Sequence, residues 1–309
     1  MLRLHTNQDY CQRLPLEVCG EILHRFKPLL SSSVRMAVEG SSTGRGRPPI
    51  WLTAASDVRL AGYSHEGTDT LLELQLPRLG DAAPEVYAQG EIWPTRPQPE
   101  ATAVDVLAEA VGEIASKNPE SLRYDRLLLG RLARLGRVLS DRLESISLVP
   151  TARGVVPLNR AVVENARELI QRTPPPQQVR VVGKLDMIRH STRSFALVLD
   201  DGSAVPGVLE DHQGVEFLGQ WFGKRVLVVG KAIYRPSGSL LRVDTLAVES
   251  GEGQPTLFSK VPPPRSAKVA APGTAPGGQA WKAFSSYFGQ WPGEESDEEW
   301  AAIMQELRS

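Results

Sequence analysis

The sequence predicts an α+β protein, in which an N-terminal α+β domain over residues 1–172 precedes a small five-stranded β-barrel over residues 177–250. A flexible linker over 251–280 and a tail over 281–309 are expected to follow. Three observations support this division. Apolar residues recur at helical spacing in the first part, alternation with a period of two begins after Thr173–Pro176, and proline and glycine become frequent beyond the barrel.

The overall composition predicts neither a polyanion-binding surface nor a metal site. The chain has 35 Lys plus Arg and 36 Asp plus Glu, so attraction to nucleic acid would need a local patch. Cys11, Cys19 and five scattered histidines match no metal-binding spacing, and no cofactor is expected. The sequence has no P-loop, zinc-protease or nucleophile-elbow motif, so no catalytic residue is assigned and a non-catalytic protein is predicted. A signal-peptide pattern and a bilayer-length apolar run are both missing, which predicts a cytoplasmic protein.

The first elements of the N-terminal domain are a helix and a hairpin. Pro15 suits the first turn of a helix, and the residues expected on its buried face are Leu16, Cys19, Leu23 and Phe26. After a polar, Gly-rich break, two strands are expected around a turn at Glu66-Gly67. The second strand should turn Leu72, Leu74 and Leu76 inward.

Two further helices are predicted over Ala103–Ile114 and Ser121–Asp141, and the second has two distinct faces. Its apolar face should pack in the core, and its arginine face is either a solvated surface or a footprint for nucleic acid or an acidic protein. The apolar face contains Tyr124, Leu128, Leu129, Leu132, Leu135 and Leu139, and the basic face contains Arg123, Arg126, Arg131, Arg134 and Arg137. A strand and a helix over 146–172 complete the domain, because the prolines of Thr173–Pro176 end the helix.

The residues after this stop predict five strands and one short helix. Asp201-Gly202 should form a hairpin turn between the second and third strands. The strands are expected over 177–188, 194–199, 203–209, 225–234 and 240–249, with a brief helix over 211–223. This order of elements resembles the OB-fold, whose members commonly bind single-stranded nucleic acid or oligosaccharide.

In OB-folds, ligands commonly contact the loops between strands one and two and between strands four and five, so the resemblance implies a ligand site there. If the barrel binds a phosphate backbone, the residues expected to do so are Arg180, Lys184, Arg189, His190, Arg193, Tyr234, Arg235 and Arg242. Of these, Arg180, Lys184 and Arg242 are expected to point away from the barrel core. Residues 177–249 contain nine Lys plus Arg and eight Asp plus Glu, and few aromatic residues are placed for base stacking. We therefore expect weak nucleic-acid binding, and a protein-binding or scaffold role is favoured.

The C-terminal tail contains an unusual concentration of aromatic residues and a short helix pattern. Five aromatic residues lie between Trp281 and Trp291, after a stretch rich in proline and glycine that should act as a tether. A helix is predicted over 297–307, where Ser296 can cap the first turn and Glu299 can complete a capping box. The residues expected to contact a partner are Phe288, Trp291, Trp300, Ile303, Met304 and Leu307. The helix either docks in another protein's groove or folds back on its own domain.

The segment WPGEESDEEWAAIMQEL, Trp291–Leu307, resembles the ending of small bacterial antitoxins that are encoded beside PIN-domain ribonucleases, as in VapBC-type pairs. The resemblance implies an antitoxin-like regulator whose C-terminal helix binds and inhibits a PIN-type ribonuclease. The chain departs from the usual antitoxin in its length and in lacking a recognisable N-terminal DNA-binding motif. Gly183–Gly202 is also similar to a segment of uncharacterised bacterial proteins, which implies no activity. The alternative function is that of an OB-fold protein that binds single-stranded nucleic acid and recruits partners through its acidic tail.

Overall fold

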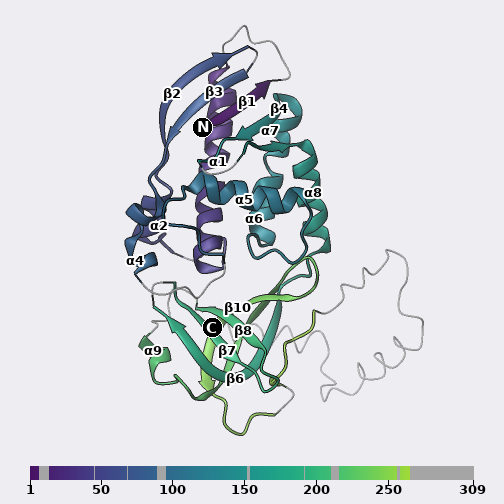
Figure 1. Ribbon diagram of the computed structural model, residues 1–309. Coiled ribbons are helices and arrows are strands. Elements are labelled where there is room, and N and C mark those ends of the chain that lie inside the picture. The colour runs from purple at the N-terminus through teal and green to yellow at the C-terminus, as the bar shows by residue number, and fades with distance from the viewer. Residues whose placement is uncertain are drawn as a thin grey trace, which may run out of the picture. The chain divides into compact units, whose positions relative to one another are not determined.

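The computed structural model describes residues 1–6, 14–44, 46–67, 69–88, 95–151, 154–190, 192–209, 216–255 and 258–264 (Figure 1). Contacts divide the chain into two units, Met1–Ser266 and Ala267–Ser309. The first unit contains both the predicted N-terminal domain and the predicted barrel. The predicted helix over 297–307 and the partner-binding residues of the tail lie outside the described residues.

The N-terminal part is built on an antiparallel sheet with the strand order β2-β3-β1-β4-β5. The predicted hairpin is confirmed, because Glu66 pairs with Asp69 across the turn. The middle strand was not predicted: Leu2 pairs with Leu72 on one side and with Leu148 on the other. The strands are β1 (Leu2–Thr6), β2 (Arg59–Glu66), β3 (Asp69–Gln75), β4 (Leu143–Leu148) and β5 (Val156–Asn159).

Helices cover this sheet and enclose the larger apolar core, and Figure 1 shows α1, α5, α6 and α8 beside one another. The described helices of this part are α1 (Leu16–Glu39), α2 (Ile50–Ala55), α3 (Leu79–Ala82), α4 (Pro84–Tyr87), α5 (Ala103–Ala115), α6 (Arg126–Ala133), α7 (Gly136–Asp141) and α8 (Arg160–Arg172). The predicted helix over Ala103–Ile114 is confirmed as α5, which begins with a capping box between Thr102 and Asp105.

The buried face of α1 differs from the predicted one. Leu16 is 86% exposed, and Cys19 and Leu23 are partly buried at the edge of the core. The core face instead carries Val18, Ile22, Phe26 and Leu29. Both sets satisfy helical spacing and both include Phe26, so periodicity alone did not distinguish them.

The predicted helix over Ser121–Asp141 is two helices, which corrects its boundaries but not its apolar face. Asp125 caps α6 by accepting a hydrogen bond from the Leu128 N–H at 3.0 Å. The break falls between α6 and α7, where Leu135 N–H bonds to Leu132 O and Gly136 packs closely against Val163 of α8. All six predicted apolar residues, Tyr124, Leu128, Leu129, Leu132, Leu135 and Leu139, are buried.

The second part of the unit is a closed barrel with the strand order β10-β8-β7-β6-β9. Strands β8 and β10 pair in parallel and the other pairs are antiparallel, an arrangement that fits an OB-like fold. The five predicted strands are therefore confirmed. The elements are β6 (Gln177–Arg189), β7 (Ser194–Val198), β8 (Ala204–Leu209), α9 (Glu216–Gly219), β9 (Arg225–Tyr234) and β10 (Leu240–Ser250).

The barrel encloses the smaller apolar core, in which Phe195 lies opposite Gly207. A Cβ on residue 207 would lie 2.2 Å from the Phe195 ring, so this position requires glycine for close packing. The predicted turn between β7 and β8 is confirmed, because the Ser203 N–H donates to Asp201 Oδ1 at 2.8 Å and Gly202 has a φ of 81°. None of the helices within the described ranges is sufficiently long and apolar to span a bilayer.

The described part of the predicted linker contacts the barrel. Ser259 is 3% exposed and accepts a hydrogen bond from Arg225 Nη2 at 2.7 Å. The Tyr234 hydroxyl donates to Pro262 O at 3.2 Å. Ser259 and Pro262 therefore pack on the barrel. Residues 265–280 of the predicted linker lie outside the described residues.

Candidate functional site

The cations predicted to bind nucleic acid divide into exposed and buried groups. Arg180, Lys184 and His190 are exposed, and His190 pairs with Glu216 at 3.1 Å. Arg189 and Arg242 are only 1% and 2% exposed, so neither offers its charge to solvent. The predicted residues are therefore not gathered on one open surface.

Arg242 on β10 lies in a buried polar network that joins the barrel to the helical part. Its Nη2 lies 3.3 Å from Asp125 Oδ2, its Nη1 donates to Gly40 O at 2.9 Å, and its Nε donates to Asp244 Oδ1 at 2.7 Å. Asp125 also accepts hydrogen bonds from the Ser42 hydroxyl at 2.6 Å and the Ser42 N–H at 3.1 Å. One arginine thus stabilises both the end of α1 and the start of α6.

The charge states of this network follow from its contacts. Burial alone would raise the pKa of Asp125, but the Arg242 guanidinium, the Ser42 hydroxyl and the N–H groups of Leu128 and Ser42 together lower that pKa below its usual value. Burial would likewise lower the pKa of Arg242, but Asp244 and Asp125 raise it. The pair is therefore held in its charged form.

Two further barrel cations, Arg189 and Arg235, also contact the N-terminal part. Arg189 is the last residue of β6, where a loop position was expected, and its Nη2 donates to Val86 O at 2.9 Å. Arg235, in the turn between β9 and β10, donates to Glu120 Oε2 at 2.9 Å. Arg193 is half-buried with a φ of 50°, and Tyr234 is 1% exposed.

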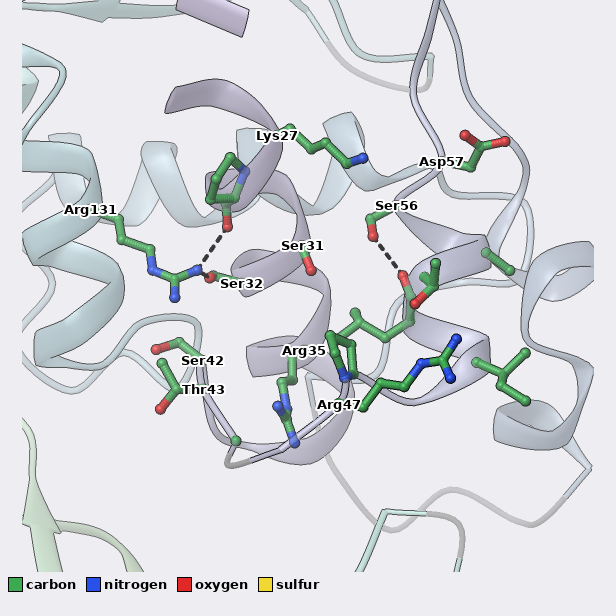
Figure 2. A pocket seen from close by; sticks show the side chains of 17 residues that line it. Lys27, Ser31, Ser32, Arg35, Ser42, Thr43, Arg47, Ser56, Asp57 and Arg131 are labelled. Atoms are coloured by element: carbon green, nitrogen blue, oxygen red, sulfur yellow. Dashed lines mark hydrogen bonds between the residues drawn. The ribbon is translucent and has the colours of Figure 1, made fainter. Parts of the chain in front are cut away.

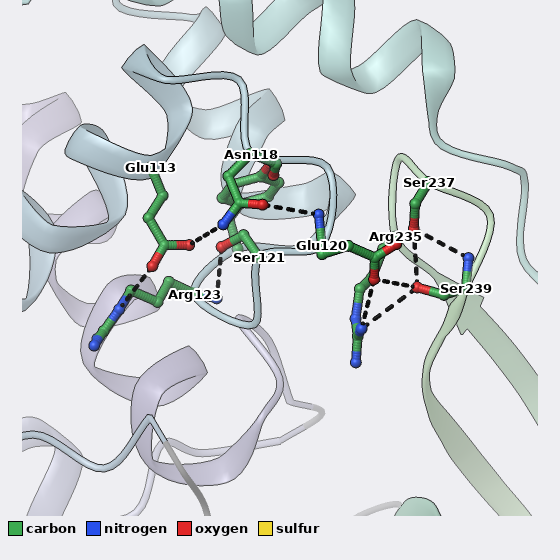
Figure 3. A network of polar contacts seen from close by, with 9 residues as sticks. Glu113, Asn118, Glu120, Ser121, Arg123, Arg235, Ser237 and Ser239 are labelled. Carbon is green, nitrogen blue, oxygen red and sulfur yellow. Dashed lines mark hydrogen bonds and ion pairs between the residues drawn. The ribbon is translucent and has the colours of Figure 1, made fainter.

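Figure 3 shows how the β9–β10 turn is fixed through Glu120. The Ser239 hydroxyl donates to Glu120 Oε2 at 2.8 Å, and the Ser237 N–H donates to Pro119 O at 3.3 Å. Hydrogen bonds from Ser237, Ser239 and Arg235 lower the pKa of Glu120. The loop that an OB-fold commonly uses for a ligand is therefore occupied by an internal contact.

A separate cavity of about 830 Å³ lies between α1, the loop that follows it, α2 and α6 (Figure 2). Lys27, Ser31 and Arg35 line it from one face of α1, since they recur every four residues. From the sequence, the segment from Glu39 to Pro49 was predicted only to be a polar break, and no binding residue was assigned to it. The remaining residues that line the cavity are Pro28, Ser32, Ser42, Thr43, Gly44, Arg47, Pro48, Ile50, Leu52, Thr53, Ala54, Ser56, Asp57 and Arg131.

The cavity is electrostatically positive. Figure 2 shows Lys27, Arg35, Arg47 and Arg131 around one space. Among the described lining residues Asp57 is the one carboxylate, and it pairs with Arg59 at 2.8 Å. Lys27 and Arg47 have no hydrogen-bond or ion-pair partner within the described ranges. Burial lowers the pKa of Arg131, whose guanidinium contacts Ser32 and donates to Pro28 O at 3.0 Å.

Arg35 forms the floor of the cavity and is 8% exposed. Its Nε donates to Glu39 Oε2 at 2.5 Å, while Nη1 and Nη2 have no acceptor in the described part of the chain. A Cβ on residue 44 would lie 1.9 Å from Arg35 Nη2, so only glycine leaves the guanidinium its space there. The loop itself is held in place because Asp125 binds Ser42.

This arrangement can hold an anion, and it offers little for acid–base or metal chemistry. Within the described ranges, His, Cys, Asp and Glu form no group of three or more that could hold a metal ion. The cavity presents guanidinium, ammonium and hydroxyl donors, which are the groups that bind phosphate and carboxylate oxygens. No protein-family model, curated protein or solved structure shows a match to this chain.

Proposed function

We propose that this protein is a non-catalytic, antitoxin-like regulator whose C-terminal segment binds and inhibits a PIN-type ribonuclease. The observation that carries the proposal is the stripe of Trp300, Ile303, Met304 and Leu307 behind the Ser296 cap. This segment belongs to Ala267–Ser309, a different unit from the one that contains both apolar cores. A short helix of this length gains its stability by docking, and a groove in a partner supplies the apolar surface.

The net charge of the tail predicts the charge of the partner's surface. Residues 294–309 contain six Asp plus Glu and one Arg, so the partner groove should have a basic rim. The barrel supports a scaffold role, since Arg189, Arg235 and Arg242 bind other parts of the same unit. The OB-like strand order keeps single-stranded nucleic-acid binding as a second candidate, with Arg180 and Lys184 as its exposed cations.

The test uses the product of the neighbouring gene, which the proposal expects to be a PIN-domain ribonuclease, in a binding assay and an RNA-cleavage assay. The full chain should bind and inhibit it, and a chain ending at residue 280 should lose both effects. Trp300→Ala with Ile303→Ala should weaken binding sharply, because these residues fill the groove. Gln305→Ala, on the opposite side of the helical wheel, is the matched control and should bind as the wild type does.

Three results would overturn the proposal. The neighbouring gene could lack the spaced acidic residues of a PIN domain, or the shortened chain could inhibit the ribonuclease as well as the full chain does. A shortened chain that keeps its partner but melts several degrees lower would identify the tail as an internal closing helix. Sub-micromolar binding of labelled oligonucleotides at physiological salt, lost in Arg180→Ala with Lys184→Ala, would favour the second candidate.

A further inference from the structure

We propose that the cavity between α1, α2 and α6 binds a small phosphorylated organic molecule, with its phosphate directed toward Arg35. The residues that line the cavity include neither the tail residues nor the barrel cations on which the proposed function rests, so this proposal is independent of that function. Its size of about 830 Å³ falls within the range of small-molecule sites in proteins.

The side chain that would donate most directly to the phosphate is Arg35, and a contact within the protein already holds it in place. Arg35 is held by Glu39 through Nε, which leaves Nη1 and Nη2 beside Gly44 to donate to the ligand. Such a guanidinium edge matches two phosphate oxygens and forms strong, charge-assisted hydrogen bonds. Lys27 and Arg47 at the rim add two positive charges that no described residue pairs.

The loop after α1 is anchored at Ser42 by the buried network described above. Ser42 is bonded twice to Asp125, and Asp125 pairs with Arg242 of the barrel. A fixed loop costs less conformational entropy on binding than one that must first be ordered. The hydroxyls of Ser31 and Thr43 also line the cavity and have no side-chain bond within the described ranges.

The ligand needs an organic body as well as a phosphate. Inorganic phosphate would leave most of the cavity unfilled, and Ile50 lies at its edge with 89% of its surface exposed. Pro48 and Pro28 add apolar surface on which such a body could rest. Since none of the described residues that line the cavity is aromatic, a stacked nucleic-acid strand is a poor fit and a sugar phosphate is favoured.

Isothermal titration calorimetry of the full chain with glucose 6-phosphate, AMP and inorganic phosphate tests the proposal. At least one of the two organic phosphates should bind more tightly than inorganic phosphate, and glucose and adenosine should not bind. Lys27→Ala with Arg47→Ala should weaken that binding by at least about tenfold, because two charge-assisted contacts are lost. Arg180→Ala, which removes an exposed barrel cation, should leave it unchanged.

The proposal is overturned if neither organic phosphate binds, or if the Lys27→Ala, Arg47→Ala variant binds as the wild type does. Equal binding of glucose 6-phosphate and glucose would also overturn it, since the phosphate would then contribute nothing. Binding of a short oligothymidylate in place of both organic phosphates would assign the cavity to nucleic acid instead. The double variant removes exposed side chains, so circular dichroism should show that it is folded.

Discussion

Arg242 of the barrel and the two cations at the rim of the cavity, Lys27 and Arg47, differ in what neutralises their charge. Arg242 has two carboxylate partners, Asp125 and Asp244, and is almost completely buried. Lys27 and Arg47 are exposed and have no partner in the part of the chain that the structure describes. The first side chain is therefore buried and paired, whereas the other two are exposed and unpaired within the described residues.

This difference separates cations that hold the fold from cations that are free to bind a ligand. A buried, paired arginine is costly to remove because its partners lose their counter-charge. An exposed cation without a partner costs little to remove, and its charge is available to an anion. Substitutions in the two groups should therefore change different measurements.

The largest effect is expected from Arg242→Ala. The substitution leaves Asp125 buried without its main counter-charge and removes the donor to Gly40 O, so the free energy of unfolding should fall by about 3–5 kcal/mol. Urea denaturation followed by circular dichroism would measure the change. Arg180→Ala on the open side of β6 is the control, with a change within about 0.5 kcal/mol. A loss under about 1 kcal/mol for Arg242→Ala would show that the network does not hold the two parts together.

The same network predicts a dependence on acid pH. The pKa of Asp125 is lower in the folded protein than its usual value of 3.8, so its contribution to stability is complete above that value and is lost as the pH falls through the folded pKa. The stability deficit of Asp125→Asn relative to the wild type should be largest near neutrality and should narrow below about pH 4. Urea titrations across this range would measure the gap. A gap that stays constant from neutral to acid pH would contradict the lowered pKa.

The barrel was the part of the fold that the sequence predicted best. Its strands alternate apolar and polar residues over many positions, and apolar residues of this pattern such as Val181, Leu185 and Leu197 are buried in the barrel core. Strand β1 was missed, because five residues carry little periodicity and its partners Leu72 and Leu148 are distant in sequence. Local patterns do not contain such long-range pairings.

The burial of Arg242 was not predicted, for a related reason. Alternation shows which face of a strand a residue occupies, but it does not show what covers that face. Here Gly40 and Asp125, far away in the sequence, contact the outer side of β10. The cavity was missed in the same way: the spacing of Lys27 and Arg35 on one helical face was readable, whereas the contribution of Arg131 depends on how α6 packs on α1.

A smaller effect is expected at the exposed contact of Arg235 with Glu120. The Glu120 side chain is 54% exposed, so water and salt screen the pair. A double-mutant cycle with Arg235→Ala and Glu120→Ala should give a coupling free energy of about 0.2–1 kcal/mol, decreasing at high salt. A coupling as large as that expected for Arg242 would mean that this turn is a main attachment of the barrel.

The smallest change in stability is expected for Lys27→Ala with Arg47→Ala, and here the comparison between the two groups is sharpest. The unliganded variant should unfold within about 0.5 kcal/mol of the wild type, because no described contact is lost and repulsion with Arg35 and Arg131 is relieved. An organic phosphate that binds the folded wild type should raise its melting temperature in proportion to the logarithm of the ligand concentration. The variant should lack most of this rise, whereas Arg180→Ala, which removes an exposed barrel cation, should keep it. Differential scanning fluorimetry with and without glucose 6-phosphate or AMP measures both quantities on the same samples. If the variant is already destabilised by more than about 1 kcal/mol without ligand, Lys27 and Arg47 hold the fold as Arg242 does, and the distinction between the two groups of cations fails.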